Sequence, residues 1–177
     1  MNVLDENTMN KLRVFASCME PEDALMQFSE ECTELSESCL HIVINAESIP
    51  DQDNYKMLHD RFIMEAADVR NAILTLHEKE LIDDIRMPLM EFNGNLFLNL
   101  ALMVEKASRY AHKMRRTMGH GQPTDDSMKT VKAELSVIVS ALIAWLEGFE
   151  KSSLLSLEEE KKIMAFKINR GICGFKS

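Results

Sequence analysis

The sequence predicts an all-α protein built around a four-helix bundle, and three observations lead to this prediction. Apolar residues recur at alternating steps of three and four over several long stretches, which is the spacing of a helix that buries one face. Only six glycines and four prolines interrupt the 177 residues, whereas Leu, Met, Glu, Lys and Ala, which favour helices, are abundant. No stretch keeps the strict alternation of a half-buried strand.

The first two predicted helices have clear boundary signals. Residues 5–18 can form a short helix whose apolar side chains face inward. Pro21 then suits the first position of a second helix, because its fixed φ is helical and its missing N–H would have no partner there. Acidic residues directly after it favour the positive end of the helix dipole. We expect this helix to reach about Ala46, with a buried seam made of Leu25, Phe28, Cys32, Leu35 and Cys39.

A third helix is predicted over about residues 53–79, after a short connector around Pro50. Short connectors join antiparallel neighbours, so we expect residues 22–79 to form a helical hairpin. The apolar seam of its second helix consists of Phe62, Ala66, Val69, Ile73 and Leu76.

A second hairpin is predicted over residues 96–149. Pro88 and the Asn-Gly-Asn run at 93–95 predict a break ahead of it, with a short helix before that break. The glycines and the proline of residues 119–123 form the clearest loop of the chain. The two helices of this hairpin are expected over about 96–118 and 125–149.

A last helix and a tail are predicted over residues 155–170. Ser156 and Glu159 have the spacing of a capping box, which starts a helix that we expect to end before Gly171. At this length the chain can bury a substantial core, so residues 1–177 are expected to form one domain.

Two acidic pairs lie on the first hairpin at helical spacing. Glu31 and Glu34 lie three positions apart on one helix, and Glu65 and Asp68 repeat that spacing on the next. Each acid comes one residue before a seam position, so all four lie on the same flank of their seams. In an antiparallel pair these flanks face each other. The four carboxylates are therefore predicted to converge at the edge of the core.

Converging carboxylates repel one another, so the arrangement is costly unless a cation neutralises them. Oxygen ligands without Cys or His favour Mg²⁺, with Mn²⁺ as the alternative metal, over zinc. Two other interpretations stay open. Glu30, Glu34 and Glu37 also share a helix face, so Glu30 competes with Glu31 as a ligand. All of these acids could also be ordinary solvated residues on two acidic helices.

The run EECTEL at 30–35, followed by EAADV at 65–69, resembles the EExxEL…ExxD signature of the all-α nucleoside triphosphate pyrophosphohydrolases. This family includes MazG, dimeric dUTPase and dCTP pyrophosphatase. The resemblance implies that magnesium ions hold a triphosphate while water attacks its α-phosphorus, giving a nucleoside monophosphate and pyrophosphate. It implies four metal ligands here, namely Glu31, Glu34, Glu65 and Asp68. Glu34 is our candidate for the acid that accepts the proton of the water, and Asn71, one turn beyond Asp68, is a candidate contact to sugar or base.

A weak internal repeat relates the two hairpins. Residues 65–78 align without gaps on 134–147, and of the four acids only Glu65 meets an acid, Glu134. Asp68 meets Val137. A separate alignment of the seams of the preceding helices places Glu31 and Glu34 over Met103 and Lys106, and a shift of one turn stays open there. The chain would then be a fused pseudo-dimer with one metal site; the alternative is two unrelated antiparallel helix pairs. This layout resembles the dimeric dUTPase branch, which implies dUTP or dCTP as the substrate.

Basic residues recur at steps of three and four on the helix before the loop, at Lys106, Arg109, Lys113 and Arg116. We interpret this basic stripe as a candidate contact for the β- and γ-phosphates. The alternative is a solvated face that pairs with acids on neighbouring helices. Near the C-terminus, Lys167 and Arg170 resemble the basic tail of several family members, which implies that they close over the phosphates; a frayed chain end is the alternative.

Charge and composition exclude other function classes. A formal net charge of −9 argues against a nucleic-acid-binding surface, which needs a basic footprint. Cys32 and Cys39 fall on seam positions and no CxxC pair exists, so we expect buried thiols in a reducing compartment. The sequence contains no secretion signal and no apolar run of membrane length. We therefore expect a cytoplasmic protein without a membrane partner, and pairing into a homodimer stays open.

The sequence argues against one other enzyme class and leaves one non-enzymatic function open. A ferritin-like di-iron site needs Glu-x-x-His on two helices, and no His of this chain follows a Glu at that spacing. The remaining alternative to an enzyme is a non-catalytic regulatory or partner-binding helical module derived from the same fold.

Overall fold

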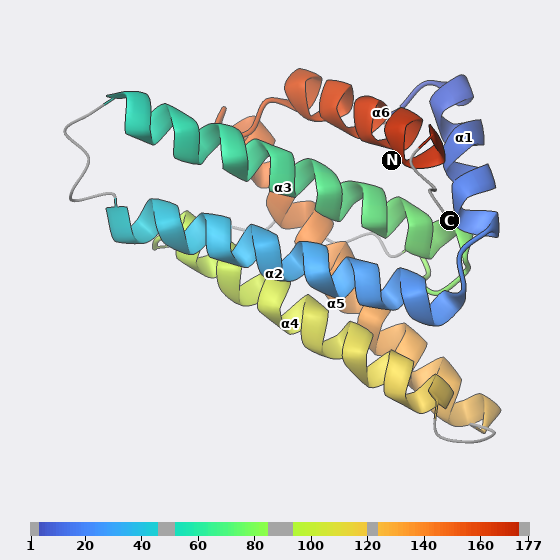
Figure 1. Cartoon of the computed structure of the whole chain (residues 1–177). Coiled ribbons are helices and arrows are strands. Elements are labelled where there is room, and N and C mark those ends of the chain that lie inside the picture. Colours follow the sequence, from blue (N-terminus) through green and yellow to red (C-terminus); the bar gives the residue numbers. More distant parts are fainter. Residues whose placement is uncertain (1–3, 46–51, 85–93, 120–123, 174–177) are drawn as a thin grey trace.

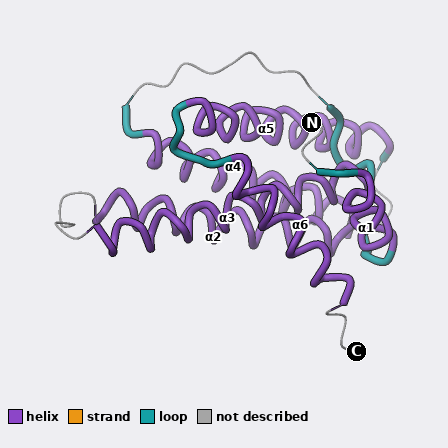
Figure 2. The backbone as a smooth tube through the Cα atoms, turned by 90° about the horizontal axis from the view of Figure 1, so that it is seen from above, coloured by secondary structure: helices purple, strands orange, loops and turns teal. Residues whose placement is uncertain are grey.

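The computed structural model describes residues 4–45, 52–84, 94–119 and 124–173, and within these ranges every regular element is a helix (Figures 1 and 2). The predicted all-α class is confirmed. The six helices are α1 (Glu6–Ser17), α2 (Pro21–Asn45), α3 (Gln52–Glu78), α4 (Leu96–Gly119), α5 (Asp125–Lys151) and α6 (Leu157–Cys173).

Capping side chains fix several of these boundaries. Asp5 accepts a hydrogen bond from the Thr8 N–H at the start of α1, at 3.1 Å. Thr124 accepts one from the Ser127 N–H at the start of α5, at 3.3 Å. Each bond satisfies a helix N–H that has no partner within the helix.

The helix at the C-terminus begins as predicted and ends later. The Glu159 N–H donates to Ser156 Oγ at 3.4 Å, which confirms Ser156 as the capping residue. The predicted end before Gly171 was wrong, because α6 continues to Cys173. A glycine costs a helix only about 1 kcal/mol relative to alanine, so it does not by itself end one. The short helix expected before the break at 93–95 falls mostly on residues 85–93, which lie outside the described residues.

The bundle is formed by α2, α3, α4 and α5, with α2 packed against both α3 and α4, and α4 against α5. The predicted seams point inward, and their residues on α2 are at most 1% exposed. At one end, the rings of Phe62, Phe97 and Phe149 join α3, α4 and α5, with centroids 5.2–5.5 Å apart. Cys32 and Cys39 are buried free thiols, as expected.

Two further helices, α1 and α6, cover the side of α3 that faces away from α4 (Figure 1). Their contact with α3 is a small apolar cluster made of Leu12, Ala67, Leu74, Met164 and Ile168. Beside it, Arg70 is 1% exposed and pairs with Glu150 of α5 and Glu160 of α6. The sequence did not reveal this ion-pair network, which fixes α6 against α3.

The two segments aligned as a repeat have similar patterns of burial. In both 65–78 and 134–147, the second, third, fifth and sixth residues are buried, and the last residue is exposed. Two antiparallel helix pairs with the same seam also produce this pattern, so the duplication stays a prediction.

Candidate metal centre

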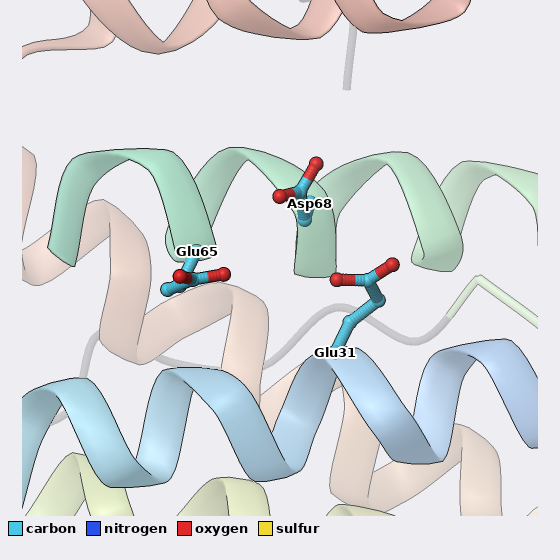
Figure 3. A group of neighbouring side chains, drawn as sticks. All are labelled: Glu31, Glu65 and Asp68. Atoms are coloured by element: carbon cyan, nitrogen blue, oxygen red, sulfur yellow. The ribbon is translucent and has the colours of Figure 1, made fainter. Parts of the chain in front are cut away.

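Three of the four predicted acids meet between α2 and α3. Glu31 of α2 and Glu65 and Asp68 of α3 each offer a carboxylate oxygen, and these oxygens lie within 4.8 Å of one another. Figure 3 shows Glu31 reaching from α2 towards α3, where Glu65 and Asp68 lie on successive turns. Because each acid precedes a seam residue, its side chain lies at the rim of the core, and Glu65 is only 9% exposed. We call Glu31, Glu65 and Asp68 the acid cluster.

The fourth predicted ligand, Glu34, lies at the outer edge of this group. Its side chain is exposed, and its carboxylate is not among the oxygens that lie within 4.8 Å of one another. Its negative charge nevertheless raises the pKa of all three acids in the cluster. Glu30, the alternative ligand on α2, is also exposed and outside the cluster.

Burial and mutual repulsion disfavour the charged forms of the cluster. Burial, followed by the charges of Asp68 and Glu34, raises the pKa of Glu31 to about 7. Burial is also the main cause of the raised pKa values of Glu65 and Asp68. Keeping three charged carboxylates close together in this poorly solvated position therefore costs free energy. A bound cation would offset that cost.

Two side-chain cations partly neutralise the cluster. The Lys167 ammonium group of α6 donates to Asp68 Oδ2. The Arg61 guanidinium lies 3.5 Å from Glu65 Oε1, one turn away on the same helix. Glu31 forms no close ion pair with a described cation; the Lys167 charge lowers its pKa in part, but burial and the other acids still raise it to about 7. When all three carboxylates are ionised, they exceed the two monovalent cations by one negative charge.

A small cavity of about 110 Å³ opens beside the cluster between α1, α2, α3 and α6. Glu31, Asp68 and Lys167 lie at its wall, together with Leu12, Phe15, Gln27, Asn71, Thr75 and Ile168. A larger hollow of about 460 Å³ lies against the outer face of α3, and its lining includes none of the three acids. We therefore take the smaller cavity as the one that belongs to the site.

The cavity wall contains two amide side chains, and in the described structure the oxygen atom of each lacks a hydrogen-bond partner. Within the described structure, Gln27 Oε1 and Asn71 Oδ1 are buried and accept no hydrogen bond. The Asn71 amide nitrogen makes only a long contact, 3.5 Å, to the Met164 carbonyl. Buried polar atoms normally have partners, so orphaned ones facing a cavity are candidates for a ligand contact. Asn71 is thus where the sequence predicted a ligand contact, whereas Gln27, one turn before Glu31, was missed.

The basic stripe of α4 does not line this cavity. Arg109 pairs with Glu105 of its own helix, and Lys113 pairs with Glu134 of α5. Lys106 is exposed, with no ion pair among the described residues. These positions fit the alternative of a solvated face paired with nearby acids.

The two basic residues predicted near the C-terminus have different surroundings. Lys167 reaches the cluster, as described above. Arg170 is exposed, with its guanidinium carbon 5.9 Å from the centre of the Phe166 ring, and does not line the cavity. The described part of α6 therefore brings one of the two to the acids. Of the residues that sequence reasoning missed, Arg61 has a detectable signal, because it lies four positions before Glu65.

None of the described helices is both long and apolar enough to cross a membrane. Comparisons with protein-family models, with curated proteins and with solved structures found no significant match.

Proposed function

We propose that the protein is a Mg²⁺-dependent nucleoside triphosphate pyrophosphohydrolase, with Mn²⁺ as the alternative metal. The observation that carries this proposal is the acid cluster, in which three carboxylates from two helices converge within 4.8 Å beside a cavity. They are three of the four acids through which the sequence resembles the all-α pyrophosphohydrolases. The proposed products are a nucleoside monophosphate and pyrophosphate.

The residues present fit a magnesium ion. All three converging ligands are carboxylate oxygens, the donor type that this metal prefers, and no Cys or His is among them. The fully ionised cluster, the form that a metal binds, keeps one excess negative charge after its two side-chain cations are counted. When bound, magnesium supplies positive charge for the phosphoryl oxygens and lowers the pKa of a bound water.

The chain's own residues have distinct tasks in the proposed reaction. Glu31, Glu65 and Asp68 hold the metal. Glu34 is exposed at the edge of the cluster, where it can accept a proton from the attacking water. The unpartnered amide oxygens of Gln27 and Asn71 can accept hydrogen bonds from the sugar or base.

The proposed substrate is a deoxypyrimidine triphosphate such as dUTP or dCTP. This choice rests on the resemblance of the two-hairpin layout to the dimeric dUTPase branch. The apolar side chains of Leu12 and Phe15 at one wall of the cavity are compatible with a base that lies beside them.

Product analysis over a panel of ribo- and deoxyribonucleoside triphosphates tests the proposal. We expect monophosphate and pyrophosphate in Mg²⁺, and neither product in EDTA. Glu34→Gln is expected to lower turnover by about 10²-fold or more, the usual effect of losing a general base. Asp68→Asn should abolish turnover, whereas Glu30→Gln, a neighbouring exposed acid, should leave it unchanged.

Two results would contradict the proposal in different ways. Turnover that survives both Glu34→Gln and Asp68→Asn would place the reaction in another cleft. Absence of turnover on every nucleotide, with a folded protein, would favour the non-catalytic regulatory or partner-binding module.

A further inference from the structure

Lys167 makes a contact with the acid cluster that a bound metal would have to replace. Its ammonium group donates to Asp68 Oδ2, and both residues line the same cavity. A divalent cation held by the cluster would need the Asp68 carboxylate and would repel a neighbouring ammonium group. The two cations therefore compete for one carboxylate.

The other cation of the cluster is placed differently. Arg61 approaches Glu65 from the same helix at 3.5 Å, and it does not line the cavity. Lys167 comes from α6, and its side chain, 39% exposed, already borders water. A displaced Lys167 ammonium group could thus be hydrated at once.

Contacts other than that of Lys167 also attach α6 to α3. The Glu160 carboxylate of α6 accepts a hydrogen bond from Arg70 Nε at 2.5 Å, and both side chains are buried. Met164 and Ile168 of α6 are also buried in the contact with α3. Because a lysine side chain has a flexible four-carbon stem, its head group can leave Asp68 while the helix stays in place.

We propose that Lys167 is an exchangeable counter-cation of the acid cluster, which holds Asp68 in the metal-free protein and leaves that carboxylate when a divalent cation binds. This inference rests on the metal site of the proposed function. Lys167 then stabilises the metal-free protein and weakens metal binding, so it sets the metal concentration at which the site fills.

Lys167→Met and Lys167→Gln test this role, and Lys162→Met, an exposed lysine on the same helix, is the matched control. Mn²⁺ and Mg²⁺ binding to the chain of residues 1–177, freed of metal with EDTA, is measured by isothermal titration calorimetry at pH 8. The melting temperature is measured with and without metal. Both Lys167 variants should bind metal more tightly, roughly tenfold, within the 5–150-fold range usual for coupled sites. Without metal, both should melt below the wild type, and the control should match the wild type in both measurements.

Three other outcomes would each overturn the counter-cation role of Lys167. Wild-type protein that binds metal while the Lys167 variants bind it equally or more weakly would overturn the counter-cation role and leave the metal site intact. Lower melting temperatures with and without metal, at unchanged affinity, would also overturn it, because they indicate packing alone. If neither the wild type nor the variants bind metal, the proposed metal-dependent function fails, and this inference fails with it.

Discussion

Glu31 is the least compensated charge of the acid cluster. Burial and the neighbouring acids raise its pKa to about 7 against the lowering effect of the Lys167 charge, and Glu31 forms no close ion pair with a described residue. A carboxyl group whose pKa is raised on folding binds its proton more tightly in the folded protein than in the unfolded chain. Its contribution to stability is therefore fully present below its ordinary pKa of 4.5, and it is lost as the pH rises through about 7.

Glu31→Gln is expected to stabilise the metal-free protein at pH 8, because it removes a charge that burial disfavours. The melting temperature should rise by about 2–4 °C for each kcal/mol in a protein of this size. At pH 5, where Glu31 is largely protonated in the folded protein, the difference should shrink. Thermal melts in EDTA from pH 5 to pH 8 measure this.

The neighbouring exposed acid provides the control for this experiment. Glu30→Gln should change the melting temperature little at either pH. Equal melting temperatures of wild type and Glu31→Gln across the whole range would show that the Glu31 charge carries no cost.

At the scale of elements, α6 is held to α3 by a buried ion-pair network. Arg70 is 1% exposed, and it bridges Glu160 of α6 and Glu150 of α5. Glu160 is itself fully buried, and burial raises its pKa to about 7 although Arg70 lowers it. The network ties the helix that carries Lys167 to the helix that carries Glu65 and Asp68.

Arg70→Met should destabilise the protein strongly, because it leaves the Glu160 carboxyl buried without its partner. Breaking a buried pair in this way costs about 3–5 kcal/mol. Denaturant unfolding measures the loss, and hydrogen exchange should show faster opening of α6 than of α2. Arg116→Met, at an exposed arginine of α4, is the control. Adding Glu160→Leu should recover part of the lost stability, and no recovery would contradict the buried-charge explanation.

At the scale of the whole molecule, the acid cluster is part of the same core as the rest of the bundle. Helix α2 contributes one acid and α3 two acids to the cluster, and each helix also contributes a seam to the core that contains α4 and α5. Metal binding at the cluster should therefore stabilise the fold as a unit rather than a single loop.

Magnesium at 100 times its dissociation constant should add about 2.7 kcal/mol to the free energy of unfolding. The increase should appear as one shifted thermal transition and disappear in EDTA. Because the chain has a net charge of −9, salt at equal ionic strength must be the reference. A stabilisation that persists in Glu65→Gln/Asp68→Asn would show that it arises from general screening.

Local sequence patterns determined the helices, their seams and the flank on which each acid lies. A seam residue such as Cys32 or Val69 fixes which side of its helix is buried, and the acid before it then lies at the rim. The short hairpin connection brings the rims of α2 and α3 together, so the meeting of Glu31 with Glu65 and Asp68 could be predicted. These features depend on periodicity and on neighbours in the chain.

The tertiary structure alone decided which groups from distant segments surround the acids. It placed Lys167 of α6 on Asp68, directed Arg109 and Lys113 of the basic stripe to other acids, and left Glu34 at the exposed edge. It also formed the cavity from α1, α2, α3 and α6. Periodicity fixes which face a helix buries, but the rotation and contact points of helices far apart in sequence depend on how the whole core packs.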